Sequence, residues 1–286
     1  MDIVPLLLHG VGDTVRKGDF MVNRGWIHIK YLPRISNNDT SFGIGYAERT
    51  KKITKHFKDQ FEILRSQVEQ PKYFAKRLRM NYIYKGPVLE WYIRFKIKIE
   101  NYYALYNSLI SPTAKVLDIG CGYGQTSYML HFLGRNRKIT GIDLDEEKVD
   151  IANNCFSKKD NINFVAQSIL TYDIEAHDTF IITDVLHYLK YEEQETVIKR
   201  CIDKLNPGGI ILIKEADNKN KRGQKLTWLS EFFSTNFGFN QMSHRELYFT
   251  SADEISKIAA KYNMEFSIAQ DPQYSSNTIF AIRHKA

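Results

Sequence analysis

The chain has 286 residues, of which 43% are apolar and 13% aromatic, enough to bury a sizeable core and too many for a disordered chain. Its mean hydropathy is −0.39, and no unbroken apolar run approaches the roughly 20 residues of a transmembrane helix. The opening "MDIVPLLLHG" lacks the basic region and the cleavage site of a signal peptide. The cysteines, Cys121, Cys155 and Cys201, form neither a disulfide framework nor a CxxC zinc pattern. We therefore expect a cytoplasmic protein with no metal site.

The formal net charge of +7 is concentrated in one segment. Residues 45–98 contain 14 Lys and Arg residues against 5 Asp and Glu residues, whereas the rest of the chain has 26 against 28. A basic excess can indicate nucleic acid, an acidic lipid surface or solubility alone. Because the charge is local, it indicates the role of that segment rather than of the whole chain.

The first 36 residues are rich in glycine turns and short β-branched or aromatic runs, such as residues 26–31, which predicts two or three short strands. The polar stretch "SNNDTSFG" at residues 36–43 is the best candidate linker. The His-Gly-x-Gly-Asp stretch, the Lys-Gly turn and the strand that ends in proline resemble the C-terminal tail of PlsC-like glycerolipid acyltransferases. The HxxxxD catalytic motif of those enzymes is missing from these residues, so the resemblance implies a remnant or a segment of a fused protein, without acyltransferase activity.

Residues 37–110 form a basic and aromatic region in which we expect helices. Ile53, Phe57, Phe61, Leu64 and Val68 recur at spacings of three and four residues, which predicts an amphipathic helix that ends before Pro71. The preferred interpretation is a helical cap that packs its apolar stripe on a domain and exposes its lysines. A helix on an anionic membrane surface, through residues 45–98, is the alternative. Nucleic acid is the least favoured partner, since no RNA- or DNA-binding motif accompanies the charge.

From residue 111 to the end, strand and helix signals alternate. We expect strands at residues 115–120, 138–143, 162–167, 179–185 and 210–215, with helices between them, which indicates a doubly wound parallel sheet. Ser251 and Glu254 have capping-box spacing at the start of a further helix. Two strand-like stretches close the chain with no helix between them, so we expect an antiparallel pair. The expected α/β domain therefore has one reversed strand.

A glycine-rich turn follows the first of these strands. Asp118 precedes Gly120, Gly122 and Gly124, and glycines there let the backbone approach a ligand where a Cβ would clash. An acidic residue would oppose a phosphate but suits an ammonium group. Asp143 ends the next strand, 19 residues after Gly124, where a carboxylate can accept both hydroxyls of a ribose. A ligand with a ribose, a positive amino-acid end and no phosphate is indicated, and S-adenosylmethionine has all three features.

The motifs "DIGCGYG", "GIDLD" and "LNPGGIILI" resemble class I S-adenosylmethionine-dependent methyltransferases over residues Asn101–Lys285. The resemblance implies a Rossmann-like, seven-stranded sheet whose last strand is antiparallel. It places Asp118, Gly120, Cys121, Gly122 and Gly124 near the methionine part of the cofactor. Further along the chain it implies Asp143 at the ribose and Leu144, Ser168 and Ile169 around the adenine. Ser168 stands where the family usually has an acidic residue, and its hydroxyl can still accept from the adenine amine.

Residues after the fourth strand face the transferred methyl group in this family, which here implies Asp184, His187 and Tyr188. His187 is the leading candidate for a general base because imidazole titrates near neutral pH. Glu215, at the end of the fifth strand, is a further catalytic candidate. Packing of His187 at a helix start and solvation of Glu215 are the structural alternatives.

The long connection of residues 216–249 is also rich in aromatic residues. Together with the aromatic residues before the glycine turn, it predicts an apolar lid and hence an aromatic or lipid-like acceptor, methylated on oxygen or carbon. The expected aromatic and apolar lid residues are Trp228, Phe232, Phe233, Phe237, Phe239 and Met242 in this connection, and Trp91, Tyr92, Phe95, Tyr102, Tyr103 and Tyr106 before the glycine turn.

The predicted organisation is thus a β-rich segment (1–36), a basic helical cap or linker (37–110) and a methyltransferase domain (111–286). We expect an enzyme that methylates a small molecule. The alternatives are a non-catalytic S-adenosylmethionine-binding module of a fused acyltransferase system and, with less support, an RNA or protein methyltransferase.

Overall fold

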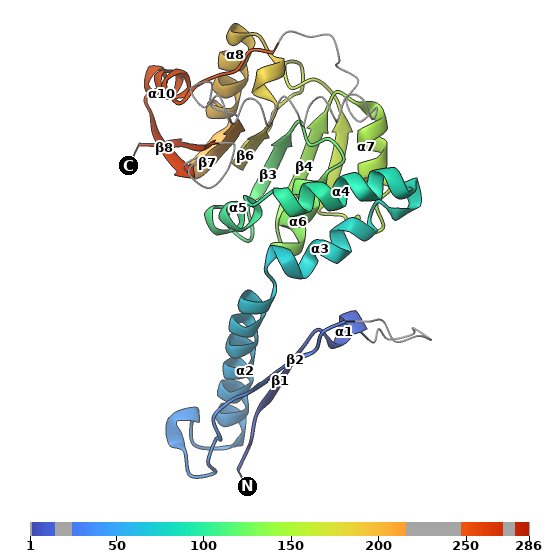
Figure 1. Cartoon of the computed structure of the whole chain (residues 1–286). Helices are drawn as coiled ribbons and strands as arrows, with labels where there is room; N and C mark the ends of the chain where they lie inside the picture. Colours follow the sequence, from blue (N-terminus) through green and yellow to red (C-terminus); the bar gives the residue numbers. More distant parts are fainter. Residues whose placement is uncertain (1, 15–24, 216–246, 271–277, 286) are drawn as a thin grey trace. The chain divides into compact units, whose positions relative to one another are not determined.

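The computed structural model describes residues 2–14, 25–215, 247–270 and 278–285 (Figure 1). The chain divides into two compact units, Met1–Tyr73 and Phe74–Ala286. The division falls inside residues 37–110, which the sequence suggested as one region, and the three predicted segment boundaries stay a prediction. No helix of the described part is long and apolar enough to cross a membrane.

The first unit is a two-stranded sheet packed on one long helix. Strands β1 (Leu6–His9) and β2 (His28–Tyr31) pair antiparallel, flanked by the short helices α1 (Val11–Thr14) and η1 (Thr40–Phe42). Because successive side chains of a strand point to opposite faces, Leu7 is buried while Leu6 and Leu8 are exposed. Leu7 packs with Leu32 and Leu64 against the apolar stripe of α2 (Tyr46–Val68). The predicted strands and amphipathic helix are confirmed.

Short helices precede the sheet of the second unit. They are α3 (Pro71–Met80, which begins at the end of the first unit), η2 (Ile83–Lys85), α4 (Pro87–Ile99) and α5 (Tyr103–Leu109). Pro71 is the first residue of α3, since proline has no N–H to lose at a helix start. The Tyr82 hydroxyl donates to the carbonyl of Tyr123 at 2.8 Å, and Phe74 packs on Phe132. These contacts attach the helices to the sheet domain.

Seven strands form the sheet in the order β5-β4-β3-β6-β7-β9-β8. Their bounds are β3 (Lys115–Ile119), β4 (Lys138–Asp143), β5 (Ile162–Ala166), β6 (His177–Thr183), β7 (Leu205–Glu215), β8 (Met264–Gln270) and β9 (Thr278–His284). All neighbouring pairs up to β7 are parallel, and β9 pairs antiparallel with both β7 and β8. The predicted seven-stranded sheet with its last strand reversed is confirmed. The fifth strand, expected at residues 210–215, begins earlier: β7 includes residues 205–209, and its pairing with β6 shifts register there.

Helices cover both faces of the sheet (Figure 1). Leu117 and Ile119 of β3 belong to a core that includes α8 (Tyr191–Ile202) and α10 (Ala252–Lys261). Asp118 points to the other face, where it contacts α6 (Gln125–Leu133), and α7 (Glu146–Asn153) packs on β4 and β5. Ser251 caps α10 by accepting from Glu254 N–H at 3.2 Å, as its spacing predicted. The remaining short helix, η3 (Leu186–Tyr188), follows β6.

Candidate active site

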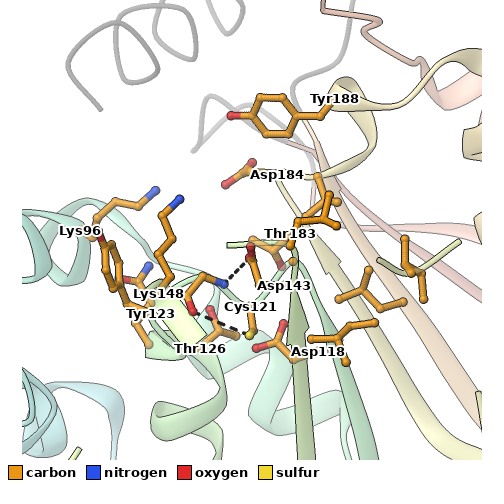
Figure 2. Close-up of a pocket in the computed structure, with 18 of the residues that line it drawn as sticks. Lys96, Asp118, Cys121, Tyr123, Thr126, Asp143, Lys148, Thr183, Asp184 and Tyr188 are labelled. Atoms are coloured by element: carbon orange, nitrogen blue, oxygen red, sulfur yellow. Dashed lines mark hydrogen bonds between the residues drawn. The ribbon is translucent and has the colours of Figure 1, made fainter. Parts of the chain in front are cut away.

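A cavity of about 230 Å³ opens at the carboxyl ends of β3, β4 and β6. The strand order reverses at β3, which lies between β4 and β6, and ligands of open α/β sheets bind at such a point. Strand ends and the loops after them supply most of the wall, and α4 and the residues after it supply the rest (Figure 2).

The glycine turn connects β3 to α6 with three residues in left-handed backbone conformation. Gly120, Gly122 and Gly124 have φ values of 70°, 51° and 73°. A Cβ on Gly120 would lie 2.2 Å from Val185 Cγ2, and one on Gly124 would lie 2.6 Å from the Phe164 ring. Of these three glycines, Gly122 alone has open space at the Cβ position among the residues that the structure describes. At two of the three positions, the protein's own side chains leave no space for a Cβ. The sequence analysis instead attributed the need for glycine to the approach of a ligand.

Asp143 ends β4 with its carboxylate held by backbone donors. Gly122 N–H donates to Oδ2 at 2.7 Å, and Asp145 N–H donates to Oδ1 at 3.0 Å. Asp143 lines the cavity, and each of its oxygens retains a further lone pair. The carboxylate is thus oriented before any ligand binds.

Asp118 is only 2% exposed but still forms part of the cavity wall. Burial raises the pKa of its carboxyl to about 7, against a hydrogen bond from Ser127 Oγ at 2.5 Å that lowers it. The charge of nearby Asp143 adds to the increase. Asp118 is therefore near its midpoint of ionisation at neutral pH, and a cation beside it would favour the charged form.

The turn after β6 is fixed by Glu215. The Glu215 carboxylate accepts from Val185 N–H at 2.8 Å, from Leu186 N–H at 2.6 Å and from His187 Nδ1 at 2.7 Å. Both members of the His187–Glu215 pair are at most 1% exposed, and neither is among the residues that line the cavity. Their contacts support the turn, and a direct role of either residue in catalysis stays a prediction.

Four charged side chains of alternating sign, which we call the ionic chain, lie beside the cavity. Asp184 Oδ2 accepts from Lys214 Nζ at 2.6 Å, and Lys214 Nζ lies 3.4 Å from Glu100 Oε2. Glu100 Oε1 then accepts from Lys96 Nζ at 3.0 Å. Burial alone would raise the pKa of Asp184, but the Lys214 and Lys96 ammonium groups lower it overall. Asp184 is therefore ionised and only weakly basic. Its backbone φ of 55° lies in the left-handed region.

The structure brings most of the predicted site residues to one cavity. Its wall contains Asp118, Gly120, Cys121, Gly122, Asp143, Leu144, Ser168, Ile169, Asp184 and Tyr188. Gly124 lies behind the wall against Phe164. Of the predicted aromatic residues, Tyr92 and Tyr102 reach the cavity and Tyr103 and Tyr106 are buried in the core, while those of residues 228–242 lie outside the described residues.

Sequence reasoning missed several wall residues. They include Lys96, Glu100, Tyr123, Thr126, Lys148, Gln167, Thr183 and Leu189, some of which are labelled in Figure 2. Thr183 could have been found as the last residue of β6. Lys96 and Glu100 form an ordinary i, i+4 pair, which in a sequence resembles a solvated helix face.

Comparison with known proteins shows similarity to methyltransferases in the second unit. Residues 116–209 match the family model described as "Methyltransferase domain". With the sheet order and the strand-end cavity, this match supports the resemblance to class I S-adenosylmethionine-dependent methyltransferases that the sequence motifs indicated for residues Asn101–Lys285. The match does not extend to residues 1–36, whose likeness to acyltransferase tails stays a hypothesis.

Among curated proteins, the chain is similar to carboxy-S-adenosyl-L-methionine synthase of Campylobacter fetus subsp. fetus, with 29% identity over 107 residues, or 37% of this chain and 46% of that protein. It is also similar to the probable S-adenosyl-L-methionine-dependent methyltransferase TehB of Haemophilus influenzae, with 33% identity over 147 residues, or 45% and 49% of the two chains. The matched region thus spans about half the length of these relatives. The solved structure of human N-acetylserotonin methyltransferase in complex with SAM shares the fold, with a TM-score of 0.52 and 18% identity over 92% of this chain and 78% of that one.

Proposed function

We propose that this chain transfers a methyl group from S-adenosylmethionine to a small acceptor molecule. The observation that carries the proposal is the Asp143 carboxylate, held by two backbone N–H groups at a strand end beside the glycine turn. This arrangement fits a ribose, whose two hydroxyls can donate to the remaining lone pairs. Leu144 is 52% exposed although it lines the cavity, so it offers an apolar surface to an adenine ring.

The cofactor supplies a methyl group already activated on a sulfonium. The protein's part is then to bind, to orient and to exclude water. Gly120 and Val185 hold the two loops of the site in contact, and Asp118 provides a carboxyl that ionises beside a cation. Tyr188 is the catalytic candidate on the cavity wall, since its hydroxyl can hydrogen-bond to the acceptor and, as the phenolate, can take the proton that the acceptor loses on methylation. His187 and Glu215 act, in this proposal, by holding the turn that carries Tyr188.

We propose an aromatic or otherwise apolar acceptor, methylated on oxygen or carbon. The lining of the cavity supports this idea, since it contains the rings of Tyr92, Tyr102, Tyr123 and Tyr188 and the side chain of Leu189. Aromatic side chains give an acceptor ring both contact area and defined geometry.

The test is transfer of a labelled methyl group from S-adenosylmethionine into lipid, pigment and metabolite extracts, with mass spectrometry of the labelled product. Asp143→Ala should abolish cofactor binding by calorimetry, and Tyr188→Phe should reduce turnover with cofactor binding retained. Binding without turnover on any extract would favour the non-catalytic module. Label in RNA or protein would favour the macromolecular alternatives.

A membrane contact through residues 45–98 is a separate proposal, supported by the exposed lysines Lys51, Lys52 and Lys58 of α2. Its test is co-sedimentation with vesicles containing 30% anionic lipid against neutral vesicles. Binding should fall at high salt and on changing all three lysines to glutamine. Equal sedimentation with both vesicle types would refute it.

A further inference from the structure

The ionic chain has two ends on the cavity wall. Its positive end is Lys96 and its negative end is Asp184, and Glu100 between them also lines the cavity, whereas Lys214 is not among the described wall residues. In Figure 2, Lys96 and Asp184 lie on different sides of the cavity. A ligand at this end of the cavity therefore meets the Lys96 ammonium, the Glu100 carboxylate that is already paired with it, and the Asp184 carboxylate, all fixed through one network.

The Lys96 ammonium group can donate more hydrogen bonds than the one it gives to Glu100. An ammonium carries three donors, and within the described residues Lys96 Nζ makes one hydrogen bond, to Glu100 Oε1. Glu100 is in turn shared, because its other oxygen lies 3.4 Å from Lys214 Nζ. Burial would lower the pKa of Lys96, but the Glu100 carboxylate and other neighbours raise it well above the ordinary value. Lys96 is therefore a permanent cation with room for a second anionic partner.

The other wall lysine differs in this respect. Lys148 lies 3.4 Å from Asp145, its own i, i+3 neighbour, and over the Tyr123 ring. Asp145 is not shared with a second lysine in the described part of the chain. The charge arrangement thus singles out Lys96 as the anion-binding group of this wall.

We propose that Lys96 binds a carboxylate group of a ligand in this cavity, with the Lys214–Glu100 pair holding its ammonium in place. This inference rests on the proposed function, and the carboxylate has two sources there. It belongs either to the methionine end of the cofactor or to an acidic acceptor. Asp184 at the opposite end of the ionic chain suits the cationic part of the same ligand or of its neighbour.

The experiment compares ligands with and without a carboxylate, using the full chain. S-adenosylmethionine and decarboxylated S-adenosylmethionine are titrated by calorimetry into the wild type, Lys96→Met and Lys96→Arg. Lys98→Met is the matched control, since Lys98 is exposed on the same helix and the charge change is equal. If Lys96 holds the cofactor carboxylate, Lys96→Met weakens S-adenosylmethionine about tenfold or more and leaves the decarboxylated form within about twofold. Lys96→Arg, which keeps the positive charge, should retain most of the affinity for S-adenosylmethionine that Lys96→Met loses.

If the acceptor supplies the carboxylate, Lys96→Met leaves both cofactor affinities unchanged. Benzoate, tested with saturating S-adenosylhomocysteine, then binds the wild type and Lys98→Met but not Lys96→Met, while benzamide binds none of them more tightly than the others. The proposal would be overturned if Lys96→Met distinguished the two cofactor forms, and benzoate from benzamide, as well as the wild type does. It would also be overturned if Lys98→Met lost as much affinity as Lys96→Met. A wild type that binds neither cofactor form would instead remove the proposed function, and this inference with it.

Discussion

Asp118 should make cofactor binding depend on pH. Burial raises the pKa of its carboxyl from 3.8 to about 7 in the chain by itself. The cationic amino-acid end of S-adenosylmethionine would favour the carboxylate and lower that pKa in the complex. Below pH 7, binding then requires loss of a proton, so affinity rises with pH and levels off above pH 7. Affinity at pH 6 should be about tenfold weaker than at pH 8.

Calorimetry in buffers of different ionisation enthalpy counts the protons. About one proton should be released per cofactor bound at pH 6, and almost none at pH 8. Asp118→Asn is the control, because it keeps the shape but cannot titrate. The amino group of the cofactor titrates equally with both proteins. The same pH slope and proton release in Asp118→Asn would refute the assignment.

The same pKa has a consequence for stability. Because the folded-state pKa lies above the unfolded value of 3.8, the unfolded chain ionises more readily. The contribution of Asp118 to folding stability therefore falls as the pH rises from about 4 to 7, and is constant beyond that range. A pKa difference of about three units between the folded and unfolded chain corresponds to a change of at most about 4 kcal/mol in the free energy of unfolding. Urea unfolding should show Asp118→Asn gaining stability relative to wild type over this range.

Further substitutions test the other supports of the site. Gly120→Ala should weaken cofactor binding and lower the free energy of unfolding by about 2 kcal/mol or more, since its Cβ would lie 2.2 Å from Val185 in a left-handed backbone; unchanged calorimetry would contradict the packing argument. Glu215→Ala should cost about 3–5 kcal/mol in urea unfolding because it leaves buried donors without their acceptor, and Glu215→Gln less. Equal stability of all three proteins would show that the carboxylate does not hold the turn. Arg137→Met should cost about 3 kcal/mol, because the buried guanidinium donates to four backbone carbonyls, whereas exposed Lys138→Met should change stability by less than about 0.5 kcal/mol. Equal unfolding midpoints for these two variants would refute that role of Arg137.

The fold was predictable because each of its signals is local. Alternating strand and helix patterns and the final helix-free pair of strands determine the sheet and its reversed strand. The cofactor side of the site follows equally from short motifs, since the glycine turn and Asp143 each come directly after a strand. Parallel strands bring their carboxyl ends to one edge, so residues distant in the sequence meet there.

The acceptor side depends on long-range pairing that the sequence does not encode in a motif. Nothing in "TDVLHYL" indicates that His187 turns inward to meet Glu215, 28 positions away. Lys96 and Glu100 form a pattern typical of exposed helices, and only their proximity to Lys214 makes them part of a buried network. Such contacts require the three-dimensional arrangement.

The close approach of Gly120 and Val185 joins two loops that lie 65 positions apart in the sequence, so it limits which substitutions the site can accept. A side chain at position 120 would meet Val185 and would also have to adopt a left-handed backbone with φ at 70°, so a smaller residue at 185 would remove only one of the two obstacles. Directed evolution toward new acceptors should therefore leave Gly120 unchanged, because both Val185 and the backbone conformation oppose a side chain at that position.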